Sequence, residues 1–146
     1  MRATETPMDL NVRYTAPDAP AEFTRMIRET GFAVLTDHPV SHDLIFETYA
    51  EWQRFFASDE KHRYVYDRET YWGYYPYLSE NAKDQDVKDL KEFFHVFCWS
   101  PIPDGMSDRT RRLYETLNAL AETLLGWIDD HSPAEVAAQY PTPLRG

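Results

Sequence analysis

The chain is poor in cysteine and in long apolar stretches. Its 146 residues include one cysteine, Cys98, so no disulfide can form within the chain. That usage is typical of proteins kept in a reducing compartment, and we expect a cytoplasmic location. No apolar run approaches the roughly 18 residues of a membrane span, and the N-terminal residues lack the apolar core of a signal peptide. We therefore expect no membrane partner.

Basic residues are also scarce. The chain has 15 Lys and Arg against 25 Asp and Glu, which gives a formal net charge of −10 and a sequence pI near 4.8. Affinity for nucleic acid comes largely from Lys and Arg that displace counterions from phosphates. The charge balance therefore argues against a nucleic-acid partner. With only five glycines spread along the chain, no phosphate-cradling loop is present either.

Apolar and aromatic residues, in contrast, are plentiful. They make up 42% and 15% of the chain, while a mean hydropathy of −0.63 indicates a heavily charged surface. A chain of this length can bury about two-thirds of its unfolded surface. We expect one domain over residues 1–146, with a loose start at 1–17, an ordered part at 18–140 and a tail at 141–146.

Two helices are predicted in the first half of the chain. The first spans 19–30, with Asp18 as its N-cap, and it ends at Gly31 because glycine tolerates a positive φ. The second begins after Ser41, whose side chain can accept from the free amides of the first turn. Its apolar residues at helical spacing, expected to form one buried stripe, are Ile45, Tyr49, Trp52 and Phe56. A short further turn of helix is expected after Ser58.

Two more helices are predicted towards the C-terminus. One spans about 108–130 behind Ser107, with a leucine stripe at helical spacing. That stripe consists of Leu113, Leu117, Leu120 and Leu124. Ser132 and Glu135 have the spacing of a capping box, which predicts a short helix running to about 139.

Only two segments are good candidates for a sheet. One is the strand 32–35, and the other is 91–98, whose period-two pattern is apolar on both faces. A third segment, 10–14, could form an edge strand. The fold class is therefore α/β (α+β), with about four helices around a small sheet.

Residues 64–77 hold seven aromatic side chains. The rings could plug the core or its edge, because aromatic residues bury large areas while their hydroxyl groups find partners. Alternatively, they could form the wall of a binding pocket.

Four segments in order carry a family resemblance: GFAVLTDHPV at 31–40, EWQRFFASDEKHRY at 51–64, GYYPY at 73–77 and DLKEFFHVF at 89–97. Over roughly residues 8–130 the chain resembles the N-terminal region of the isopenicillin N synthase-like oxygenases, which depend on iron(II) and 2-oxoglutarate. The resemblance implies that Tyr74, Tyr75 and Tyr77 lie near the mouth of a substrate pocket. It also implies that the strand at 91–98 joins the sheet of a catalytic jelly roll.

In that family, iron is held by a His-x-Asp pair with a distal His, and 2-oxoglutarate is bound through an Arg-x-Ser motif. None of the five histidines in this chain is followed two residues later by Asp or Glu, and no Arg-x-Ser occurs. We therefore assign no catalytic residue and no cofactor to the chain itself. The weak local cluster of His38 and His42 is the best remaining candidate for a metal site.

Two classes of function remain open. The chain could be the N-terminal portion of an oxygenase that oxidises a small molecule, inactive without its catalytic half. Alternatively, it could be a stand-alone module that binds a partner or itself, for example as a homodimer, through an exposed sheet edge and the aromatic loop.

Overall fold

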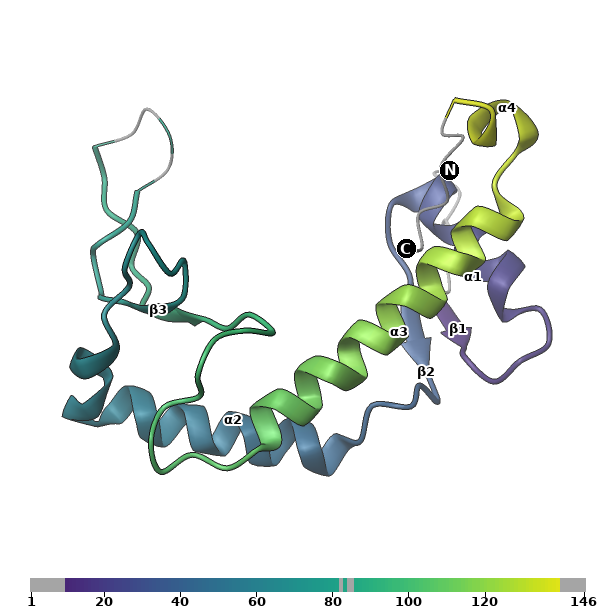
Figure 1. Cartoon of the computed structure of the whole chain (residues 1–146). Coiled ribbons are helices and arrows are strands. Elements are labelled where there is room, and N and C mark those ends of the chain that lie inside the picture. The colour runs from purple at the N-terminus through teal and green to yellow at the C-terminus, as the bar shows by residue number, and fades with distance from the viewer. Residues whose placement is uncertain (1–9, 82, 84–85, 140–146) are drawn as a thin grey trace, which may run out of the picture. The chain divides into compact units, whose positions relative to one another are not determined.

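The computed structural model describes residues 10–81, 83 and 86–139. Contacts along the chain divide it into two compact units, coloured by residue number in Figure 1. Unit 1 combines the described residues up to Val40 with those from Thr116 onwards, and unit 2 is Ser41–Glu115. The predicted tail at 141–146 lies outside the described residues.

Unit 1 is built on two short parallel strands. β1 (Asn11–Arg13) pairs with β2 (Val34–Thr36), and Val12 stands opposite Leu35. The possible strand at 10–14 is thus confirmed as β1, so the expected loose start is ordered from this strand on. The strand predicted at 32–35 is also confirmed, although it begins two residues later than expected.

Helix α1 (Ala19–Thr30) covers the β1–β2 pair and matches the predicted helix 19–30. It ends as predicted at Gly31, which has a φ of 75° and donates its N–H to the carbonyl of Ile27. Asp18 does stand at the N-cap position, but its side chain makes no capping hydrogen bond. Proline in the first turn lacks an N–H and leaves one donor fewer to be capped.

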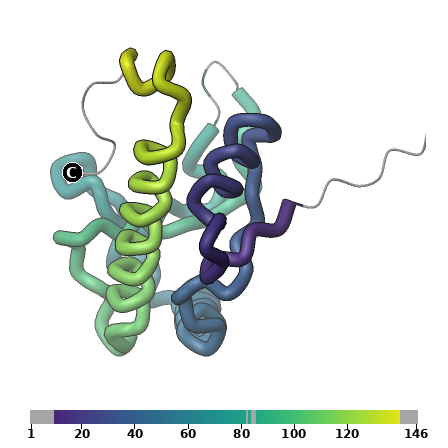
Figure 2. Tube along the Cα trace, turned by 90° about the vertical axis from the view of Figure 1, so that its right-hand side faces the viewer, coloured from purple at the N-terminus to yellow at the C-terminus, as the bar shows by residue number. Residues whose placement is uncertain are grey.

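The second half of α3 (Arg109–His131) completes the core of unit 1. It lies beside α1 in both views (Figures 1 and 2), and the Thr24 hydroxyl donates to the Trp127 carbonyl at 3.0 Å. The Trp127 ring packs edge-on against Phe23 at 5.8 Å. The buried centre consists of Val12, Ala19, Phe23 and Met26, packed against Leu124, Trp127 and Ile128.

The leucine stripe and the last helix differ in part from prediction. Leu113, Leu120 and Leu124 are half-buried, but Leu117 is 48% exposed, so its place in a buried stripe is wrong. The short helix α4 (Ala134–Ala137) does exist. Ser132 does not cap it, because its hydroxyl donates to the Ile128 carbonyl at the end of α3 instead.

Unit 2 begins with α2 (His42–Ala57), followed by the 3-10 helix η1 (Asp59–Tyr64). Ser41 caps α2 as predicted, since its hydroxyl oxygen accepts from the Leu44 N–H at 3.3 Å. The start of α3 is fixed to α2, because Arg109 binds Glu47 at 2.7 Å and Glu51 at 3.0 Å. Ser107 supports this start as predicted, with its oxygen 3.2 Å from the Arg109 N–H.

The buried face of α2 is not the predicted stripe. Leu44, Thr48 and Phe55 are buried, whereas Tyr49 is 71% exposed. Thr48 can be buried because its hydroxyl donates to the Leu44 carbonyl at 2.6 Å. Trp52 is half-buried against the Phe94 ring, so the second half of the stripe does meet a partner.

Unit 2 also contains the remaining strands, β3 (Gly73–Tyr75) and β4 (Phe93–His95). The segment 91–98 is confirmed as strand at its centre, where β4 pairs antiparallel with β3. The expected single small sheet is therefore two separate two-stranded sheets, one in each unit. The structure has four α-helices and one 3-10 helix in the described residues, close to the expected four. None of these helices combines the length and apolarity that crossing a bilayer requires.

Candidate functional site

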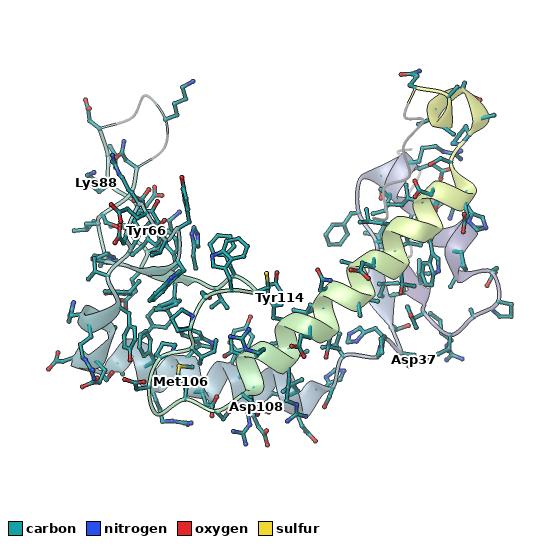
Figure 3. The ribbon with its side chains drawn as sticks, viewed as in Figure 1. Asp37, Tyr66, Lys88, Met106, Asp108 and Tyr114 are labelled. Atoms are coloured by element: carbon teal, nitrogen blue, oxygen red, sulfur yellow. The ribbon has the colours of Figure 1, made fainter. Side chains whose placement is uncertain are left out.

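The β3–β4 pair separates two sets of aromatic side chains. Tyr74 stands opposite Phe94, and Tyr75 stands opposite Phe93. Because neighbouring residues of a strand point to opposite faces, Tyr74 and Tyr75 project to different sides. Val65 forms a bridge to Tyr74 and adds a short third segment to the pair. Figure 3 shows Tyr66, the next residue, among the dense side chains of unit 2.

One face of the pair belongs to the core of unit 2. The Phe94 ring lies 5.0 Å from Trp52 and 5.6 Å from Phe55, both on α2. Tyr74 is 2% exposed, and its ring also faces α2, 6.2 Å from Phe56. For this face the core-plug interpretation of the tyrosine-rich segment is confirmed.

Tyr74 contacts an ion pair formed by Glu92 and Lys61. The Tyr74 hydroxyl donates to Glu92 Oε2, and Lys61 Nζ binds the same oxygen at 2.9 Å. Lys61 also donates to the Phe56 carbonyl at 2.7 Å and lies 5.5 Å from the centre of the Tyr74 ring. The Tyr74 hydroxyl and the Lys61 ammonium thus both have partners, as a partly buried ion pair requires.

These contacts shift the three ionisation equilibria. The hydrogen bonds from Tyr74 and then Lys61 lower the pKa of Glu92. The hydrogen bond to Glu92 raises the pKa of Lys61, while burial and then the Glu92 bond raise the pKa of Tyr74. At neutral pH the group is therefore a carboxylate, an ammonium and a neutral phenol.

A pH prediction follows from the lowered pKa of Glu92. A carboxyl with a lower pKa in the folded state binds fewer protons than in the unfolded chain, so it stabilises the fold above its unfolded pKa of about 4.3. That stabilisation is lost as pH falls through the folded pKa. We expect the free energy of unfolding to fall more steeply below about pH 4.3 in the wild type than in Glu92→Gln.

Urea unfolding between pH 3 and 7 measures this difference. A matched control is Glu60→Gln, which removes an exposed carboxylate of η1 that pairs with Arg63 at the surface and is expected to leave the acid slope nearly unchanged. Parallel acid slopes for the wild type and Glu92→Gln would mean that the Tyr74–Glu92–Lys61 group does not hold the carboxylate.

The opposite face of the pair carries a continuous line of rings, which we call the aromatic row. It consists of Tyr66, Tyr75, Phe93, His95, Phe97 and Trp99. Tyr75 stacks on Phe93 at 4.4 Å and 12°, and Phe97 stacks on Trp99 at 4.7 Å and 10°. His95 joins the two stacked pairs, with its ring 4.7 Å from Tyr75 and 6.2 Å from Phe97.

The aromatic row is accessible and neutral over most of its length. Trp99 is 65% exposed, and His95 is also exposed. Burial, followed by the hydrogen bond with Tyr66, raises the pKa of Tyr75 to about 12, so its phenol stays protonated at neutral pH. The row can therefore offer apolar ring edges, phenol groups and one imidazole to a bound molecule.

The structure separates the three predicted pocket residues. Tyr74 lies in the core, Tyr75 lies half-buried in the aromatic row, and Tyr77 is 53% exposed beyond the end of β3. Substrate contact by any of them stays a prediction. Sequence reasoning did not single out Phe93, His95 and Phe97, although the period-two pattern of 91–98 places all three on one face.

The two weak metal candidates fall in different units. His38 is in unit 1, two residues after β2, and His42 is the first residue of α2 in unit 2. Throughout the described residues, no group of three or more His, Cys, Asp or Glu side chains is placed to hold a metal ion. A facial triad of two histidines and one carboxylate is therefore not formed among the residues that the structure describes.

Comparison with known proteins gives a consistent assignment. Residues 9–119 match the family described as the N-terminal domain of non-haem dioxygenase in morphine synthesis. The crystal structure of a candidate oxygenase from Shewanella oneidensis has 42% sequence identity and a TM-score of 0.80. The match covers 94% of this chain but 50% of the other, so the chain spans about half the length of that protein.

No curated protein matches the chain significantly. The family match nevertheless extends over most of the sequence and includes α1, α2, both sheets and the start of α3. This chain therefore belongs to the non-haem dioxygenase N-terminal family.

Proposed function

We propose that this chain forms the N-terminal part of an oxygenase that uses iron(II), oxygen and 2-oxoglutarate to oxidise a small molecule. Its family membership and its likeness to half of an oxygenase chain support this proposal. The observation that carries it is the aromatic row, an accessible line of rings that runs along one face of the β3–β4 pair and on to Trp99. In the resembling enzymes this strand joins the jelly-roll sheet, so the row would form one wall of the substrate pocket.

The chain's contribution would be to binding and positioning. Ring edges and the Tyr75 phenol would contact an apolar substrate and exclude water, while the His95 imidazole could hydrogen-bond one polar substituent. The ligands of iron and 2-oxoglutarate would come from a catalytic half outside this chain. We accordingly propose that residues 1–146 are inactive alone.

Metal titration of the isolated chain tests whether the iron ligands lie outside it. We expect calorimetry with iron(II) under anaerobic conditions, or with cobalt(II), to show no stoichiometric site, because an open facial site needs three fixed donors. A site of micromolar affinity that survives a weak competing chelator would refute the proposal. His38→Ala and His42→Ala would then be the first variants to examine.

The second candidate function is a stand-alone interaction module, and exposed rings favour it. Trp99 and Tyr77 are 65% and 53% exposed, and apolar surface of this kind is commonly buried by a second copy across a two-fold axis. On this proposal the chain is a dimer in which the aromatic row covers itself.

Light scattering at tens of micromolar distinguishes this candidate. A homodimer should strengthen with salt, which screens the net charge of −10, and Trp99→Asp should dissociate it. Phe46→Asp, at a 69% exposed aromatic residue of α2, is the matched control. A monomer at all salt concentrations would exclude the dimer, and dissociation by the control variant alone would place the interface elsewhere.

A further inference from the structure

A groove of about 330 Å³ opens between α2 and β4, within unit 2. Four aromatic side chains and one valine line it, together with a single charged residue, Glu92. These lining residues are Trp52, Phe56, Phe93, Phe94 and Val96. The volume lies at the lower end of the range for small-molecule sites, about 300–1,000 Å³. Apolar walls with one polar group are typical of such sites.

The chemistry of the walls favours a cation. The faces of aromatic rings are negative, and rings gathered around a site attract organic ammonium groups. One of the lining rings already contacts a cation of the protein, since Lys91 Nζ lies 5.2 Å from the centre of the Phe93 ring. Trp52 directs its Nε1–H to Thr110 at 2.9 Å, so its ring is held in a fixed orientation.

Glu92 supplies the acceptor of the groove. Tyr74 and Lys61 both bind its Oε2, and in the described part of the chain no donor contacts Oε1. Lys61 offsets part of the carboxylate's charge, so the rings must supply much of the attraction for a cation. The net charge of −10 favours the approach of a cation over that of an anion.

We propose that the groove between α2 and β4 binds a small organic ammonium ligand, with the cationic group against the rings of Trp52, Phe56 and Phe94 and any donor directed to Glu92. The proposal does not rest on the oxygenase function, although the groove shares Phe93 with the aromatic row. It uses the side of β4 that faces α2, together with the edge at Phe93, and it requires no metal.

A ligand pair that differs only in charge tests the proposal. Choline and its uncharged carbon isostere, 3,3-dimethylbutan-1-ol, are titrated into the full chain at constant ionic strength. The readout is the assigned indole N–H signal of Trp52 in NMR spectra. We expect saturable shifts with millimolar choline and at least about fivefold weaker binding of the alcohol, because each cation–π contact contributes a few-fold in affinity.

Variants locate the site. Val96→Lys places a competing ammonium in the groove and should abolish choline binding, whereas Val87→Lys, at a 78% exposed valine outside it, should leave binding unchanged. Phe56→Leu keeps an apolar wall but removes a ring, and should weaken binding about two- to fivefold. Circular dichroism checks that each variant folds.

Three results would overturn the proposal. Equal affinities for choline and the alcohol would show that the groove binds apolar groups without a preference for a cation. Unchanged choline binding in folded Val96→Lys would place the site elsewhere. The absence of a saturable shift with millimolar choline would mean that the groove binds no ammonium ligand.

Discussion

Gly73→Ala is expected to lower the free energy of unfolding by roughly 2–6 kcal/mol, the combined range for backbone strain and overpacking. Gly73 has a φ of 129°, a backbone conformation that residues with a side chain rarely adopt. A Cβ at this position would lie 2.7 Å from the Tyr64 carbonyl oxygen and 2.8 Å from the Tyr66 Cα. Both are backbone atoms, so no side-chain rotation can relieve the clash.

The control is Gly105→Ala. Gly105 also has a positive φ, 79°, but nothing lies within 4 Å of its added Cβ. The Gly105→Ala variant should lower the free energy of unfolding by only about 1–2 kcal/mol, the strain of a left-handed alanine. Urea unfolding of the two variants measures the difference. Equal losses would show that the segment 64–66 does not pack closely against Gly73.

Phe55→Ala is the second large effect, with an expected cost of about 3–5 kcal/mol. Phe55 is 7% exposed, and its ring lies 5.3–6.0 Å from those of Trp52, Phe56, Phe94 and Tyr64. Removing it leaves a cavity at the centre of the unit 2 core. Phe46→Ala, on the same helix but 69% exposed, should change stability by less than about 0.5 kcal/mol.

The same variant tests the proposal that residues 18–140 form a single domain. The methyl signals of Met26 and Met106 report on unit 1 and unit 2 separately, because each unit holds one of them. In a single cooperative domain both signals should disappear at one temperature, and Phe55→Ala should lower that temperature for both. A shift confined to Met106 would show that the two units unfold independently.

Local signals in the sequence predicted the helices well. Gly31 ends α1 and Ser41 caps α2 because each acts through backbone groups within four residues. The strands were harder to predict, since the four in the described residues are each three residues long and β1 pairs with a strand more than twenty residues away. No periodic pattern can specify a partner at that distance.

The buried face of α2 differs from the predicted stripe for another reason. Ile45, Phe46 and Tyr49 place apolar residues around much of the helix, so hydrophobic spacing alone did not define its buried side. Thr48 is buried there because its hydroxyl is satisfied by the Leu44 carbonyl, a compensation that a hydropathy pattern cannot reveal.

The candidate site was predictable only in outline. The tyrosine-rich segment and the two-sided strand at 91–98 were visible in the sequence, and the structure brings them together as β3 and β4. Glu92 and Lys61, in contrast, are 31 residues apart in the sequence. The fold brings them together because Lys61 lies in η1 and Glu92 directly precedes β4. Whether a tyrosine faces the core or the aromatic row depends on the register of β3 against β4, which places Tyr74 on one face and Tyr75 on the other.

We propose that this chain supplies the N-terminal part of an iron(II)- and 2-oxoglutarate-dependent oxygenase. The most direct test fuses it to the half of the Shewanella oneidensis protein that it does not cover, and measures succinate formed from 2-oxoglutarate with iron(II) and oxygen. We predict that the fusion forms succinate while this chain alone does not. A folded fusion that binds iron(II) yet forms no succinate, or succinate formation by this chain alone, would contradict the account.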